Sequence, residues 1–104
     1  MFGFRVPIDP IAIQRDIADG TALLVDVRTA AEWNDGHAQG AIHVPAEDIM
    51  QGTTPTTDES VKLYVYCRSG GRAGTAARLL QEKGYTVENI GGLSDWVRAG
   101  GVVS

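Results

Sequence analysis

The stretch Lys62–Gly74, KLYVYCRSGGRAG, decides the fold that the sequence predicts. Its first five residues, Lys62–Tyr66, include a valine and two tyrosines, which are typical of a β-strand. Cys67, the only cysteine of the chain, comes next, and a small, glycine-rich, cationic loop follows it. Beyond the loop, alanines and a leucine recur at helical spacing as far as Gly84. The stretch therefore predicts a strand, a tight loop and a helix, in that order.

Strand and helix patterns also alternate along the rest of the chain. Thr21–Val27, TALLVDV, is a nearly continuous apolar run, as expected of a buried parallel strand. The remaining patterns predict strands at Ala41–Val44 and Thr86–Ile90, helices at Pro10–Ala18, Thr29–Trp33, Ala46–Met50 and Leu93–Ala99, and a turn at Gly91–Gly92. This alternation indicates a single α/β domain, residues 1–104, whose mostly parallel sheet is flanked by helices.

Composition excludes several classes of protein. A chain of 104 residues with 43% hydrophobic residues can bury a core, and its net charge of −4 argues against a nucleic-acid-binding surface. One cysteine excludes an internal disulfide and a CxxC redox pair. His37 and His43 have no third ligand at a recognisable spacing, so no metal site is predicted.

Targeting signals are also missing from the sequence. The N-terminal residues MFGFRVPIDP contain no long apolar segment of the kind found in secretory signals. No apolar run approaches the length needed to span a membrane. We therefore expect a cytoplasmic protein with no membrane partner and no nucleic-acid partner.

The loop after Cys67 has the composition of an anion-binding turn. Gly70 and Gly71 allow left-handed backbone and close approach to a ligand, and successive amides in such a turn bind anions. Arg68 and Arg72 add positive charge. These groups favour a thiolate at Cys67, and the thiolate is the nucleophilic form. The alternative is that Cys67 is simply a small buried apolar residue, as lone cysteines usually are.

Three charged residues near the first strand are candidates for supporting roles. Asp26 lies at the strand end, where it either orients the loop or, as we favour, caps the strand end. Arg28 and Glu32 are four residues apart across a predicted helix start, and this spacing predicts that they pair with each other.

Taken together, the motifs resemble those of single-domain rhodaneses, a family of sulfurtransferases. The resemblance covers roughly Asp9–Gly100 and rests on an ordered set of motifs: Asp26-Val27-Arg28, Glu32-Trp33, Gly36-His37, Gly40-Ala41-Ile42, Val44-Pro45, Cys67-Arg68-Ser69-Gly70-Gly71-Arg72, and Gly91-Gly92 with Trp96. It implies a central parallel sheet between helices, and no metal or organic cofactor.

The resemblance also implies a reaction. In that family the cysteine, here Cys67, takes a sulfur from thiosulfate or a similar anionic donor, becomes a persulfide, and passes the sulfur to cyanide or a thiol. Backbone amides from Arg68 to Arg72, including those of Ser69, Gly70 and Gly71, are expected to hold the terminal sulfur. Asp26 and Arg28 are candidates for positions behind this loop.

Two other functions are alternatives to this reaction, and the loop length argues against the first. Cysteine phosphatases place five residues between cysteine and arginine, whereas four separate Cys67 from Arg72, so a smaller cradle and no phosphatase activity are expected. The second is a persulfide carrier or interaction module whose partner is another protein in a sulfur relay and which has little turnover of its own.

Overall fold

The computed structural model describes residues 8–104. Residues 1–7, which belong to the N-terminal segment without a secretory signal pattern, lie outside the described part. Four parallel strands form one sheet in the order β2-β1-β3-β4. They are β1 (Ala22–Asp26), β2 (Ile42–His43), β3 (Lys62–Cys67) and β4 (Val87–Gly92). The predicted α/β fold with a parallel sheet is confirmed.

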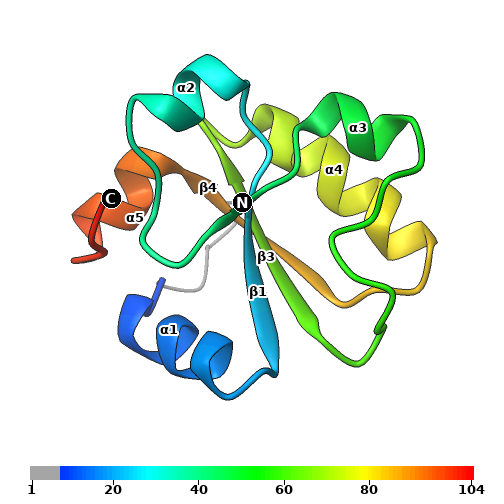
Figure 1. Ribbon diagram of the computed structural model, residues 1–104, viewed down its shortest axis with the longest axis horizontal. Coiled ribbons are helices and arrows are strands. Elements are labelled where there is room, and N and C mark those ends of the chain that lie inside the picture. The colour runs from blue at the N-terminus through cyan, green and yellow to red at the C-terminus, as the bar shows by residue number, and fades with distance from the viewer. Residues whose placement is uncertain (1–7) are drawn as a thin grey trace, which may run out of the picture.

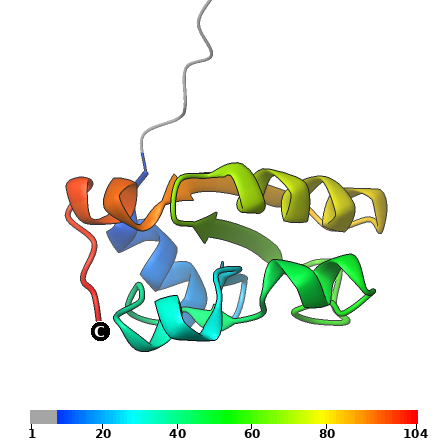
Figure 2. The same ribbon diagram turned by 90° about the horizontal axis from the view of Figure 1, so that it is seen from above.

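Helices cover both faces of the sheet. They are α1 (Pro10–Ala18), α2 (Ala30–Asn34), α3 (Ala46–Met50), α4 (Gly71–Glu82) and α5 (Leu93–Arg98). Helices α1 and α5 lie on one side, α3 and α4 on the other, and α2 lies beyond the carboxyl ends of the strands (Figures 1 and 2). None of these helices has the length and apolar composition needed to cross a membrane.

The alternation of side chains along β3 supplies both halves of the core. Leu63, Val65 and Cys67 pack with α3 and α4, whereas Tyr64 and Tyr66 pack with α1 and α5. This follows from the two-residue period of a strand, which sends successive side chains to opposite faces. The strand is therefore buried on both sides, and the thiol of Cys67 faces the α4 side.

Two predicted helix starts have the expected caps. The carboxylate of Asp9 accepts a hydrogen bond from the amide of Ala12 at 3.1 Å, with Pro10 in the first helical position. Thr29 and Glu32 form a reciprocal capping box at the start of α2. These local signals depend on neighbouring residues alone, which is why the sequence sufficed to find them.

The predicted turn at Gly91–Gly92 is wrong, because β4 runs through both glycines to the start of α5. Gly92 pairs with Cys67 after a register shift in the β3–β4 ladder. A Cβ atom on Gly92 would lie 2.1 Å from the carbonyl oxygen of Arg68. Glycine at position 92 therefore lets the strand pass directly against the loop that follows β3.

The C-terminal residues fix α5 against the rest of the domain. The backbone of His37 exchanges two hydrogen bonds with Ser104, and the amide of Gln39 donates to the carbonyl oxygen of Val102. The indole nitrogen of Trp96, a fully buried residue, donates to the same carbonyl at 3.0 Å. Trp96 is thus a packing residue, and α5 is held between the sheet and the C-terminal residues.

The contact at Gly92 leads to a prediction about stability. Gly92→Ala should lower the free energy of unfolding by about 1–3 kcal/mol, because the new methyl group meets backbone that has no room to move. Gly74→Ala is the matched control: its Cβ would meet only ordinary contacts, the nearest at 3.6 Å, inside α4. It should raise stability by roughly 0.5–1 kcal/mol, as helix propensity dictates. Urea unfolding of both variants decides this, and equal stabilities would contradict it.

Candidate functional site

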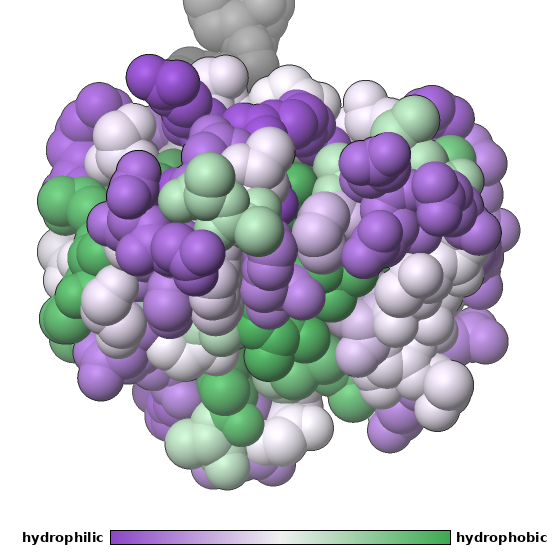
Figure 3. All heavy atoms as spheres, turned by 45° about the horizontal axis from the view of Figure 1, so that its top comes forward, coloured by the Kyte–Doolittle hydropathy of each residue, from purple (hydrophilic) through white to green (hydrophobic). Residues whose placement is uncertain are grey.

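The single thiol lies at the carboxyl end of β3, among the strand ends where parallel sheets bind ligands. Cys67 is 1% exposed, and its Sγ accepts a hydrogen bond from the amide of Gly70 at 2.9 Å. On the face that carries these strand ends, hydrophilic residues form most of the rim and hydrophobic atoms show in the hollow between them (Figure 3). The sulfur is therefore enclosed, with a polar donor directed at it.

The two glycines of the loop differ in conformation. Gly70 has a φ of 100°, in the left-handed region that favours glycine. Gly71 is the first residue of α4, and a Cβ added there would meet nothing within 4 Å. The expectation of left-handed backbone is thus confirmed for Gly70 and wrong for Gly71. Arg68 and Ser69 project from the loop as exposed residues.

The start of α4 faces the same loop. The backbone hydrogen bond at the start of α4 runs from the amide of Gly74 to the carbonyl oxygen of Gly70, at 2.9 Å. Amides in the first turn of a helix have no partner within the helix, and they form its positive end. The positive end of α4 therefore lies three or four residues beyond Cys67 and favours negative charge there.

Asn89 supports the loop from β4, and the sequence analysis did not find it. Its side-chain nitrogen donates to the carbonyl oxygen of Gly70 at 3.1 Å, and its oxygen accepts from the amide of Gly91 at 2.8 Å. Asn89 thus holds the carbonyl of the same residue whose amide donates to the Sγ of Cys67. No pattern local to residue 89 signals this, because the partner lies 19 residues earlier.

Arg72 is held by Glu32, and the predicted pairing of Arg28 with Glu32 is wrong. Both terminal nitrogens of Arg72 donate to the two oxygens of Glu32, at 2.7 and 3.0 Å. Glu32 also accepts from the amide and the hydroxyl of Thr29. The hydrogen bonds from Arg72 are the main cause that lowers the pKa of Glu32 to about 2. This bidentate pair ties the start of α4 to α2.

Arg28 pairs instead with Asp26, two residues before it. Its Nε and Nη2 donate to that carboxylate at 2.6–3.0 Å, and Nη2 also donates to the carbonyl oxygen of Gly36. The hydroxyl of Tyr66 donates to Asp26 at 2.7 Å, and burial is the main cause that raises the pKa of Tyr66. The structure thus joins the ends of β1 and β3 through a buried polar network.

The two histidines have structural contacts. His37 stacks on Trp33 with ring centroids 3.5 Å apart, and His43 stacks on the same ring at 5.0 Å. A ring nitrogen of His43 bonds the carbonyl oxygen of Arg28 at 2.8 Å. Within residues 8–104 no group of three or more His, Cys, Asp or Glu side chains is arranged to hold a metal ion.

Comparison with known families matches this architecture. Residues 9–99 match the family described as rhodanese-like domain, which is most of the chain. The chain belongs to the family of rhodanese-like domains. Among the motifs that carried the resemblance, Asp26 lies at the end of β1, Cys67 at the end of β3 and Gly92 at the end of β4, where it pairs with Cys67.

Three similar proteins illustrate this membership. The thiosulfate sulfurtransferase PspE of Escherichia coli is 40% identical over 73 residues, which is 68% of this chain and 70% of that protein. The putative sulfur carrier protein YrkF of Bacillus subtilis is 27% identical over 85 residues, and the match spans 80% of this chain but only 45% of that protein. A solved structure described as rhodanese with anions from E. coli is 37% identical, with a TM-score of 0.65, and the match covers 71% of this chain and 89% of that chain.

The contacts of Asn89 give a prediction about the loop. Asn89→Asp keeps an acceptor for the amide of Gly91 but removes the donor to the carbonyl of Gly70. The amide of Gly70 should then exchange with deuterium about two to ten times faster, the factor that corresponds to one lost hydrogen bond of ordinary strength. Nuclear magnetic resonance of the exchanging amides measures this.

Asn34→Asp, the same change on the exposed side of α2, is the control, and it should leave the exchange rate of the Gly70 amide unchanged. Equal exchange of Gly70 in both variants would contradict the role assigned to Asn89.

Proposed function

We propose that this rhodanese-like domain is a sulfurtransferase that moves a sulfane sulfur from thiosulfate, or a similar anionic donor, to a thiophilic acceptor through a persulfide on Cys67. The observation that carries the proposal is the hydrogen bond from the amide of Gly70 to the Sγ of Cys67, in a cationic loop at the positive end of α4. Its relatives include a thiosulfate sulfurtransferase and a protein described as a putative sulfur carrier, and both support the same chemistry.

The donor half-reaction needs only the thiolate. The Sγ of Cys67 attacks the outer sulfur of thiosulfate, an Sγ–S bond forms, the S–S bond of the donor breaks, and sulfite leaves with the electron pair. Charge and atoms balance without an oxidant, a metal or an organic cofactor. The thiolate form of Cys67 is the nucleophile in this step, so no proton has to be removed during the attack itself.

The loop supplies the anion-binding groups. We assign the terminal sulfur of the persulfide to the backbone amides from Arg68 to Arg72, and the hydrogen bond from the amide of Gly70 to Sγ supports this assignment. Arg68 is exposed and acts on the incoming donor through its charge. Arg72 acts through its bond with Glu32, which fixes the position of the loop. Asp26 and Arg28 hold the strand end behind the site.

The persulfide-carrier function is the second candidate, and the similarity to a putative sulfur carrier favours it. The two candidates share the persulfide and differ in the acceptor. A sulfurtransferase with independent turnover passes sulfur to cyanide or a small thiol. A carrier passes it to another protein and turns over small acceptors poorly.

Intact mass after exposure to thiosulfate tests the proposal. The reduced protein should gain one sulfur atom on Cys67, and cyanide should remove it. Cys67→Ser should gain nothing and should lose thiosulfate:cyanide turnover completely, because serine cannot form a persulfide, while its unfolding curve stays close to that of the parent. Persulfide that resists cyanide but yields to a protein acceptor would favour the carrier. Sulfur transfer retained by Cys67→Ser would refute both functions.

The two arginines of the loop should contribute differently. Arg68→Ala should weaken thiosulfate capture, with a loss that shrinks as salt screens the charge. Arg72→Ala should lower kcat/KM about 10- to 100-fold, or roughly 1.4–2.7 kcal/mol of transition-state stabilisation, and this loss should persist in salt.

Glu32→Gln, which removes the charge that holds Arg72, should also lower kcat/KM, but by a smaller factor. Steady-state kinetics at low and high ionic strength measure this, and equal losses with equal salt dependence for both arginines would contradict it.

A further inference from the structure

Helix α2 has few contacts that can hold it in place. It has five residues, and a helix of that length is not stable by itself in water. All five residues are described, and none of them is buried. Ala30, Ala31 and Asn34 are exposed, whereas Glu32 and Trp33 are half-buried. These two adjacent side chains therefore have to anchor α2 to the rest of the domain.

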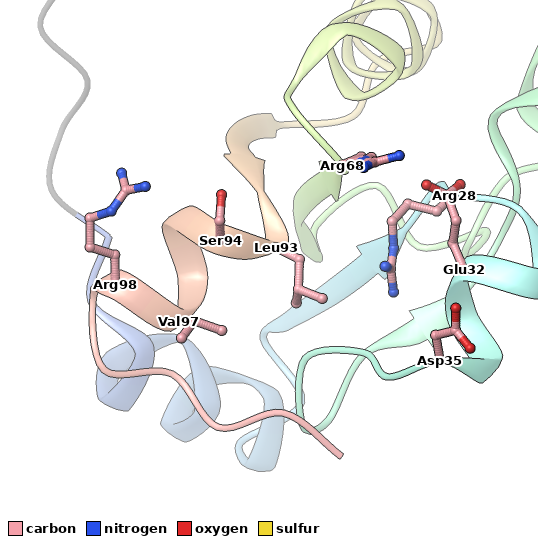
Figure 4. A pocket seen from close by; sticks show the side chains of 8 residues that line it. All are labelled: Arg28, Glu32, Asp35, Arg68, Leu93, Ser94, Val97 and Arg98. Atoms are coloured by element: carbon pink, nitrogen blue, oxygen red, sulfur yellow. The ribbon is translucent and has the colours of Figure 1, made fainter.

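Cavities separate α2 from two neighbouring helices. One cavity, of about 870 Å³, lies between α2 and α5, where Glu32 and Asp35 line one side and Leu93 and Val97 line the other (Figure 4). A second cavity, of about 430 Å³, is lined in part by residues 29–30 at the start of α2 and by residues 46–48 and 50 of α3. At these places neither α5 nor α3 packs closely against α2, so the support of α2 has to come from elsewhere.

That support includes two imidazole rings that stack on Trp33. The ring of His37 is 2° from parallel to the indole at a centroid distance of 3.5 Å, and the ring of His43 is 17° from parallel at 5.0 Å. At these distances two imidazoles have no room side by side on one face of an indole, so they lie on opposite faces. The indole then cannot tilt or shift without losing contact with one of the two rings.

Each imidazole is itself fixed by hydrogen bonds. A carbonyl oxygen only accepts, so His43 donates through Nε2 to the carbonyl of Arg28 at 2.8 Å, and His37 donates through Nδ1 to the carbonyl of Trp33 at 3.2 Å. His43 belongs to β2, and the backbone of His37 exchanges two hydrogen bonds with Ser104. The indole is thus held between the sheet and the segment that the C-terminal residues fix.

Glu32, the residue before Trp33, connects α2 to the loop of the site. Its side chain extends from α2 toward the loop that carries Arg68 (Figure 4), and its two oxygens accept from Arg72 in the first turn of α4. A bidentate pair needs both planar groups in register, so a small displacement of α2 weakens at least one of its two bonds. Because α2 is short, the contacts that place Trp33 also place Glu32.

We propose that Trp33 is a positioning residue: held between His37 and His43, it fixes α2 so that Glu32 holds Arg72 and, through Arg72, the loop after Cys67. For its effect on catalysis the inference rests on the proposed function, to which it adds residues that the sulfur-transfer steps do not use. Since Trp33 acts through Glu32 and Arg72, its contribution to turnover should disappear when Arg72 is replaced.

Two substitutions separate the flat ring of Trp33 from its apolar bulk. Trp33→Phe keeps a ring face for the imidazoles, whereas Trp33→Leu keeps an apolar side chain without one. Trp33→Leu should lower kcat/KM for thiosulfate:cyanide transfer about 3- to 10-fold, the range that corresponds to one lost stacked pair, and Trp33→Phe should retain most of the parent value. Urea unfolding checks that each variant is folded under the assay conditions.

The same substitution in the Arg72→Ala background tests whether Trp33 acts through Arg72. There Trp33→Leu should cause no further loss of kcat/KM, because the pair that Trp33 supports is already gone. A further loss as large as in the parent would overturn the inference, since Trp33 would then act independently of Arg72. Equal losses for Trp33→Phe and Trp33→Leu would also overturn it, since stacking would then not be what positions α2.

Nuclear magnetic resonance of the Arg72 guanidinium tests the link without sulfur transfer. A bidentate partner hinders rotation of the guanidinium, so its Nη–H signals should be resolved in the parent and in Trp33→Phe. They should broaden in Trp33→Leu, as they should in Glu32→Gln, which serves as the reference for a weakened pair. Unchanged signals in Trp33→Leu would overturn the link from Trp33 to Arg72. The expected signals together with a failure of thiosulfate to load Cys67 would instead refute the proposed function alone.

Discussion

The buried carboxylate of Asp26 is the interaction on which the arrangement of the site depends. It is fully buried, and a buried charge destabilises a protein by several kcal/mol unless other groups compensate it. Compensation comes from the amide and the guanidinium of Arg28 and from the hydroxyl of Tyr66. The same hydroxyl accepts from the amide of Ala38 at 2.9 Å. One carboxylate therefore connects the ends of β1 and β3 with the segment that leads to β2.

The polar network around Asp26 fixes the end of β3, and so the position of the Cys67 thiol, although the thiol does not contact the network. Tyr66 and Cys67 are consecutive on β3, so their side chains point to opposite faces of the sheet. The network fixes the backbone from the α1–α5 side, and the sulfur lies on the α3–α4 side, where Gly70 and the start of α4 meet it. The carboxylate of Asp26 accepts the amide of Arg28 at the strand end, as a cap does, while the polar group shown to contact the sulfur, the amide of Gly70, comes from the loop.

The sequence predicted features that depend on neighbouring residues and missed those that depend on distant ones. Side-chain periodicity located the central strand, and capping patterns located the starts of α1 and α2, because both are local. The role of Gly92 was missed because it depends on close approach to the carbonyl oxygen of Arg68, which belongs to the loop after β3 and is distant in the sequence. Helical spacing assigned Glu32 to Arg28, but its partner, Arg72, is 40 residues away. Within the site, Cys67 and the loop composition were evident, and the loop's support by Asn89 was not.

The acidity of the chain explains why local groups have to dominate at the site. A net charge of −4 disfavours anions at a distance. At physiological ionic strength that repulsion decays over about 8 Å, so acidic residues far from the loop contribute little at the thiol. The amides at the start of α4 and the arginines of the loop act within that range, and the charge of Arg72 is itself balanced by Glu32. Arg68 is therefore the loop charge that remains available to a ligand, and the net charge of the chain does not determine the sign of the charge beside the thiol.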